Sequence, residues 1–206
     1  ALGQVRSAAL FSGNGQDADA MTLTLSNVGI FVGVGGGLTD VGSDGDYSND
    51  TVANGTLGFG ATVTTLTLVS IKDRGASALL ATDDRTYLGV ALKDFDGDLV
   101  GLDDLLVFHA YNVDAVINKS AHADGVTAVS KLDWSTFSNT GMDLSAAKTA
   151  LNATTLGAVT ASVDLAVDGG VALNVLDGVL VAKGDFTLAL GQVRSAALFS
   201  GNGQDA

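Results

Sequence analysis

ALGQVRSAALFSGNGQDA occupies residues 1–18, and the same 18 letters recur without a mismatch at residues 189–206. The offset between the two copies is 188 residues. A match of this length identifies an internal repeat, and a fixed period is typical of arrays in which neighbouring copies contact each other. We therefore expect residues 1–188 to form one repeat period and residues 189–206 to begin the next, identical period. Duplicated arms at the two ends of a complete protein are the alternative interpretation.

The junction between the two copies reads as a β-strand rather than as a linker. Residues 186–193 read FTLALGQV, with apolar residues at positions 186, 188 and 190. The sequence begins without Met and shows neither a signal peptide nor a sorting tail, so we expect it to be part of a longer chain. A strand that crosses the junction predicts that the main partners are identical neighbouring repeats, in the same or an adjacent chain.

The composition favours short turns and strands over helices. All 23 acidic residues are Asp, and the chain has 27 Gly, no Pro and no Cys. Asp and Gly favour turns, whereas Glu, the better helix former, is absent. Without Cys there is neither a disulfide nor a thiolate metal site. The net charge of −13 excludes nucleic-acid binding through a basic patch, and no apolar run is long enough for a transmembrane helix.

Alternation of apolar and polar residues recurs along the chain. It is clearest in residues 21–34, 63–71, 87–92 and 105–117, and again in several runs between residues 163 and 190. A period of two predicts β-strands, so the expected fold class is all-β. The second face of the late strands carries small residues, which suggests that another sheet covers it: Ala182, Gly184, Ala189 and Gly191. We expect a solenoid-like or wound continuous β-sheet built from tandem repeats; tandem β-sandwich domains are the alternative.

Pairs of Gly with Asp or Asn mark the expected turns, because these residues tolerate positive φ. The turn signals are Gly13–Gly15, Asp44–Asp46, Asn54–Gly55, Asp96–Asp98, Asp168–Gly170 and Asp177–Gly178. Two stretches, Lys131–Trp134 and Asp143–Leu151, have helical character over a turn or two, the second with Asp143 as its cap.

Two groups of aspartates are candidate calcium ligands. The first is Asp94, Asp96, Asp98, Asp103 and Asp104, in which carboxylates alternate around Gly97 as in the first half of an EF-hand loop. Leu105 stands where that loop has its bidentate Glu. The second, weaker group is Asp40, Asp44, Asp46 and Asp50. Calcium is thus the only cofactor that the sequence suggests, and solvated turns are the alternative interpretation of both groups.

The sequence carries no catalytic motif, and we expect the protein not to be an enzyme. His109 lies in a strand-like run and His122 in a polar stretch, and a single His in such a place is usually a packed or surface residue. No nucleophile elbow, P-loop or zinc helix is present. The glycines of residues 33–37 fail the dinucleotide fingerprint because Leu38 replaces its last Gly.

Several strings resemble the repeats of giant bacterial surface proteins of adhesin or haemagglutinin type. They are GVLVAKGDFTL at residues 178–188, DDRTYLGV at residues 83–90, MTLTLSNVGIFVGVGG at residues 21–36 and KLDWSTF at residues 131–137. The resemblance implies an extracellular or cell-surface location and a β-rich, tandemly repeated chain. It implies no particular ligand.

These observations together predict a structural function. We expect a repeat of a secreted bacterial surface filament, stalk or sheath that assembles by continuous β-pairing between copies. The alternative is an adhesive repeat module of a large adhesin, with a glycan or a host surface as its partner.

Overall fold

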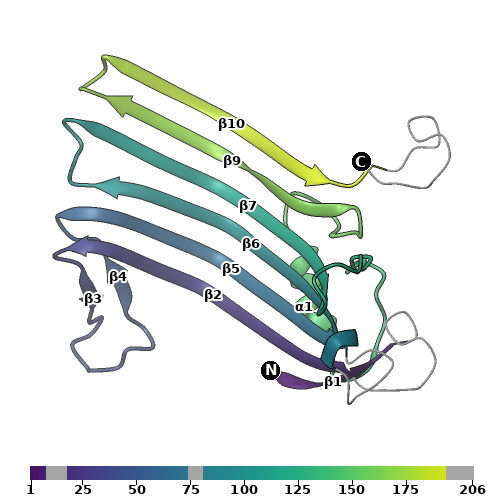
Figure 1. The fold of residues 1–206 in the computed structure, drawn as a ribbon. Helices are drawn as coiled ribbons and strands as arrows, with labels where there is room; N and C mark the ends of the chain where they lie inside the picture. Colours follow the sequence, from purple (N-terminus) through teal and green to yellow (C-terminus); the bar gives the residue numbers. More distant parts are fainter. Residues whose placement is uncertain (8–17, 74–80, 194–206) are drawn as a thin grey trace.

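The computed structural model describes residues 1–7, 18–73 and 81–193, which form mainly β-strands (Figure 1). The elements are, in chain order, β1 (Leu2–Arg6), β2 (Ala18–Val34), β3 (Gly37–Thr39), β4 (Thr51–Ala53), β5 (Leu57–Asp73), the 3-10 helix η1 (Ala81–Asp83), β6 (Arg85–Val100), β7 (Leu106–His122), β8 (Thr140–Gly141), α1 (Ser145–Leu151), β9 (Val163–Val175) and β10 (Leu180–Gly191). The expected all-β class is confirmed. Among these residues no helix combines the length and apolarity that crossing a membrane requires.

One antiparallel sheet organises the described residues. Its strand order is β10-β9-β7-β6-β5-β2-β1-β8, and the six strands from β2 to β10 follow one another as a meander. β2, β5 and β7 are each 17 residues long. The alternating runs of the sequence fall on these long strands, so the strand predictions are confirmed. β3 and β4 form a separate two-stranded hairpin.

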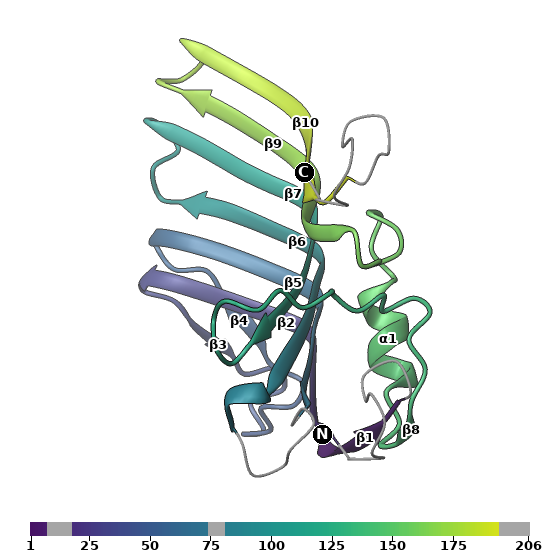
Figure 2. The ribbon, with the colours of Figure 1, turned by 45° about the vertical axis from the view of Figure 1, so that its right-hand side comes forward.

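The segment between β7 and β9, which contains β8 and α1, covers one end of one sheet face (Figure 2). It will be called the cap (residues 123–162). Apolar side chains of the cap and of the strands beneath it form one core: Val5, Ala18, Ala20, Val69, Ile71, Tyr87, Ala91, Val116, Leu132, Trp134, Phe137, Leu144, Ala147, Leu151, Val159 and Ala166. Gly89 lets the cap approach closely, because a Cβ there would lie 2.8 Å from Trp134 Cε2. The core therefore sits between the cap and one end of the sheet.

Asn118 ties the cap to the sheet. This β7 side chain is fully buried, and its Nδ2 donates to the carbonyls of Leu132 and Thr160, each at 2.8 Å. Its Oδ1 accepts the indole N–H of Trp134 at 3.0 Å. A buried amide with three partners holds the two ends of the cap segment in register with the strand beneath it.

Two of the expected turns are wrong. Asp96–Asp98 lies inside β6 and Asp168–Gly170 inside β9. Both strands are irregular there: the β6–β7 register shifts near Phe95, and Gly169 has φ +156°. The Gly signals thus mark bulged strand rather than reversals of the chain.

Three other expected turns are confirmed. Asp44–Asp46 lies in the loop between β3 and β4, Asn54–Gly55 lies between β4 and β5, and Asp177–Gly178 joins β9 to β10. Gly13–Gly15 lies outside the described residues.

The two helical stretches are confirmed in different degrees. The second contains α1, but its N-cap residue is Leu144 and not the expected Asp143. The Asp143 carboxylate, one residue earlier, accepts the backbone N–H of Ser145 at 2.8 Å. This bond and a side-chain bond from Ser145 lower the pKa of Asp143. The first stretch makes only one turn, closed by the Phe137 N–H donating to the Asp133 carbonyl at 2.8 Å.

The Asn118→Ala substitution is expected to lower the free energy of unfolding by about 3 kcal/mol or more, because it leaves three buried polar groups without partners. Chemical denaturation measures this. Lys119→Ala, which alters an exposed neighbour on the same strand, is the matched control and is expected to change stability by less than about 0.5 kcal/mol. Equal effects of both substitutions would show that Asn118 does not hold the cap.

Candidate functional site

Among the described residues, no strand pairs with the outer edge of β10. β10 pairs with β9 along its inner edge, and all 12 of its residues are exposed. Soluble proteins blunt such edges with Pro, several Lys residues, or very short strands. β10 is long, contains no Pro and has one Lys, Lys183. An unprotected edge of this length is a template for another strand.

The second open edge belongs to β2, near the other end of the sheet order. One edge of β2 pairs with β5 along nearly its whole length. On its other edge, β1 pairs only with residues 18–21, followed by two backbone bonds between Ala1 and Thr22. Within the described part of the chain, residues 23–34 have no ladder partner on that edge. This open stretch is as long as β10.

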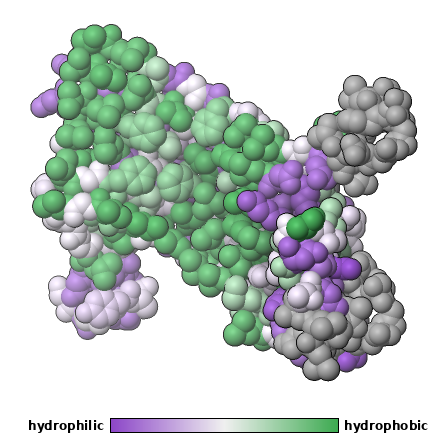
Figure 3. Space-filling model, in the orientation of Figure 1, coloured by the Kyte–Doolittle hydropathy of each residue, from purple (hydrophilic) through white to green (hydrophobic). Residues whose placement is uncertain are grey.

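The uncapped face of the sheet is apolar, as Figure 3 shows from that side. Because the strands are in register, aliphatic side chains line up across them in rows. One row is Leu23, Leu68, Val90, Ile117, Leu165 and Leu190, and the next is Leu25, Leu66, Leu92, Ala115, Val167 and Leu188.

The four small residues of the late strands do not share one face, contrary to the sequence expectation. Ala182 and Gly184 lie on the same face as Leu188, whereas Ala189 lies on the capped face. The described residues form one layer there, and β10 is exposed throughout. Leu188 remains 48% exposed at the end of its row. Apolar surface therefore continues up to the open edge itself.

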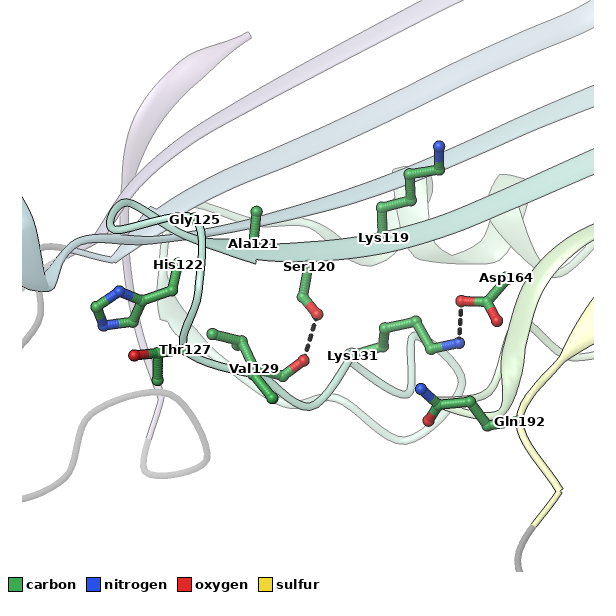
Figure 4. Close-up of a pocket in the computed structure, with 11 residues that line it drawn as sticks. Lys119, Ser120, Ala121, His122, Gly125, Thr127, Val129, Lys131, Asp164 and Gln192 are labelled. Carbon is green, nitrogen blue, oxygen red and sulfur yellow. Dashed lines mark hydrogen bonds and ion pairs between the residues drawn. The ribbon is translucent and has the colours of Figure 1, made fainter. Parts of the chain in front are cut away.

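A pocket of about 450 Å³ lies at the start of β9, beside the end of β7 (Figure 4). Lys119–His122 line one side and Gln192 the other. Lys131 of the cap forms an ion pair with Asp164, and the Ser120 hydroxyl donates to the Val129 carbonyl at 2.6 Å. The pocket exists because β9 begins at Val163, so the last residues of β7 have no neighbour in β9.

The first calcium group is divided between a strand and a turn. Asp94, Asp96 and Asp98 lie in β6, whereas Asp103 and Asp104 lie in the turn before β7. Asp96 accepts the backbone N–H of Asn112 at 2.9 Å, and Asp98 pairs with His109 across the ladder. These partners hold the carboxylates of Asp96 and Asp98 against β7, whereas Asp103 and Asp104 lie in the turn that follows β6.

The second group lies in the loop between β3 and β4, where each carboxylate accepts a backbone N–H. The Asp40 carboxylate accepts the N–H of Asp44, and Asp44 accepts that of Asp46. Asp46 accepts the N–H of Ser48, and Asp50 accepts that of Val41. The four distances are 2.8–3.1 Å. The Ser48 bonds lower the pKa of Asp46. Over the described ranges, no three Asp or His side chains come close enough to hold one metal ion.

The two histidines contact different aspartates, and both belong to β7, an interior strand of the sheet. His109 contacts Asp98 of the neighbouring strand, and His122, at the end of β7, lies 3.0 Å from Asp124. Both pairs are local features of the sheet and its first turn into the cap.

Sequence analysis missed the open edge of β2. Its apolar alternation looked like that of any strand, and only the pairing shows which half lacks a neighbour. The sequence nevertheless held a signal for this edge. The second copy of the string that contains β1 directly continues the strand-like run FTLALGQV at residues 186–193.

Comparisons of the chain with protein-family models, with curated proteins and with solved structures find no match. The resemblance to bacterial surface repeats therefore stays an expectation from the sequence, and the function is argued from the geometry of the sheet.

Calcium at Asp94, Asp96, Asp98, Asp103 and Asp104 stays a prediction that thermal unfolding tests. An ion bound only by the folded state raises the unfolding midpoint in added calcium, and a chelator reverses the rise. The double substitution Asp103→Asn and Asp104→Asn, at exposed turn positions, is expected to abolish this rise. A midpoint that is the same in calcium and in chelator removes the site.

Proposed function

We propose that this chain is a structural repeat of a secreted bacterial surface filament, stalk or sheath, in which copies join by β-pairing into one continuous sheet. One observation carries the proposal. The two open edges, on β10 and β2, are equally long and lie towards opposite ends of the strand order, and the repeated string begins within β10 and again at β1.

The energetics of sheet edges support assembly. An unpaired edge exposes a row of backbone donors and acceptors that a neighbouring strand satisfies. Apolar rows that reach the edge add a second driving force, because pairing removes Leu188 and its neighbours from water. Both forces act in the same direction along the sheet.

The charge distribution suits an extended assembly in water. The net charge is −13, and the loop between β3 and β4 concentrates four of the aspartates, of which Asp50 lies beside Asn27–Gly29 of β2. Like charges disfavour unspecific association of filaments side by side. Growth along the sheet is thereby favoured over lateral clustering.

The dimensions of the filament follow from strand spacing. Each period contributes six long strands, and at about 4.8 Å per strand the axial repeat is about 29 Å. The 17-residue strands run across the filament and give it a width of about 58 Å.

Chains of two, three and four periods test this. Small-angle scattering is expected to show the longest dimension growing by about 22–25 Å for each added period, because each period adds about 29 Å of length to a particle about 58 Å wide. A self-contained globule of 188 residues would add about 40 Å, from its expected radius of gyration. Growth by the larger step, or separate round particles in electron micrographs, would contradict a continuous sheet.

The loop between β3 and β4 favours adhesion as a second candidate function. Tyr47 in this loop is 75% exposed, and exposed aromatic rings are typical contacts for glycans and proteins. A filament could display this loop once in every period. Glycan and cell binding lost in a Tyr47→Ala variant would favour the adhesive module.

A further inference from the structure

We propose that β10 of one period and β1 of the next are a single uninterrupted strand, which fills the open edge of the next period's β2. The inference rests on the proposed assembly by β-pairing and adds its register and its neighbours. β10 extends to Gly191, and residues 189–193 repeat residues 1–5. Continuing β10 through the repeated string therefore gives β1 of the following period.

The existing ladder fixes the register of the joint. Leu2 pairs with Met21 and Val5 with Ala18, so each step back along β1 is one step forward along β2. Ala1 exchanges two backbone hydrogen bonds with Thr22, at 2.5 and 2.8 Å.

The residues before Ala1 in an array are those that end the preceding period. Leu188 of that period then lies opposite Leu23, Thr187 opposite Thr24, and Phe186 opposite Leu25. Asp185 follows, opposite Ser26.

The chemistry of these pairs matches on both faces of the sheet. Leu188 and Phe186 meet Leu23 and Leu25, which are 46% and 40% exposed in the single period, on the uncapped face. Thr187 meets Thr24 on the other face. A slip of one residue would place Leu188 opposite Thr22 or Thr24, and Phe186 opposite Thr24 or Ser26, so the pattern selects this register.

The two copies of the string also face the same way. Ala189 pairs with Ala166, a core residue on the capped face. In β1, Gly3 and Val5 pair with the core residues Ala20 and Ala18, which places Ala1 on the capped face as well. The strand therefore passes from one period into the next without a twist that would exchange its faces.

The same glutamine can serve both periods at once. Gln192 donates its backbone N–H to the Ser162 carbonyl at 3.0 Å, and Gln4, its counterpart, accepts from the Met142 N–H at 2.8 Å. In an antiparallel strand the N–H and C=O of one residue point to the same side. The joint residue thus bonds Ser162 of its own period and Met142 of the next.

The pocket beside Gln192 is where the next β8 belongs. In the first copy, β8 pairs through Gly141 with Val5 and through Thr140 with Arg6. Transferred to the joint, these two residues lie beside Val193, at the gap between β7 and the end of β10. The next period's β8 is the occupant we assign to this pocket.

Val193 shows what the joint completes. Its counterpart Val5 is fully buried beneath the cap, whereas Val193 is 58% exposed. The same residue in the same string is thus a core residue only where β2, β8 and the cap of its own period surround it. The next period supplies all three.

Disulfide trapping tests the register in a chain of two periods, residues 1–188 followed by residues 1–206. The protein has no Cys, so introduced thiols report alone. The pair Leu188→Cys in the first period and Leu23→Cys in the second is a non-hydrogen-bonded pair, with Cα atoms about 4.5 Å apart, within disulfide range. Mild oxidation is expected to close it nearly completely, and likewise Phe186→Cys with Leu25→Cys.

The control pairs Leu188→Cys with Thr24→Cys, whose side chains lie on opposite faces, and it is expected to remain reduced. Closure of both matched pairs but not of the control supports the joint. No closure in variants that still unfold cooperatively, or equal closure of the control, overturns it. The growth in length per period tests the assembly itself, so a failure of this register can be told apart from a failure of the proposed assembly.

Discussion

The hydrogen-bonding capacity of unpaired backbone at the two ends of the sheet order is the constraint from which the rest of this molecule follows. In the part of the chain that the structure describes, each long strand inside the sheet has two neighbours, whereas β10 and most of β2 have one. An identical copy could pair with these unpaired backbone groups, and no other protein would be needed. The reason is that the 18-residue string containing β1 is repeated at the end of β10. The capped core stabilises a single period, and the open edges carry the proposed pairing with other copies.

Much of the fold could be predicted from the sequence because its dominant signal is local. Alternation located the long strands, and the Asp-only, Gly-rich composition excluded a helical bundle. Turn signals were less reliable. Asp96–Asp98 has the residues of a tight turn, but pairing with β5 and β7 on both sides keeps it in the strand, so tertiary context overrides local preference.

The cap and the candidate site depend on contacts between distant residues, which a single sequence does not reveal. Asn118 and Asp114 are polar residues in an alternating strand, a pattern that predicts exposed side chains, yet both are buried. Asp114 accepts the N–H groups of Asp94 and Thr155, at 2.8 and 2.7 Å. The repeated string, in contrast, predicted pairing between copies from the start, although not which half of β2 the proposed pairing would complete.

The orientation of the strands has a mechanical consequence. Because they lie across the long axis of such a filament, tension along that axis pulls neighbouring strands apart, while each hairpin turn keeps them covalently connected at one end. The sheet would open one hairpin at a time, and every 17-residue strand released would add tens of ångströms of slack in place of about 5 Å of thickness. A tether built this way would respond to a sudden load by unfolding hairpin by hairpin and lengthening, before any covalent bond is strained.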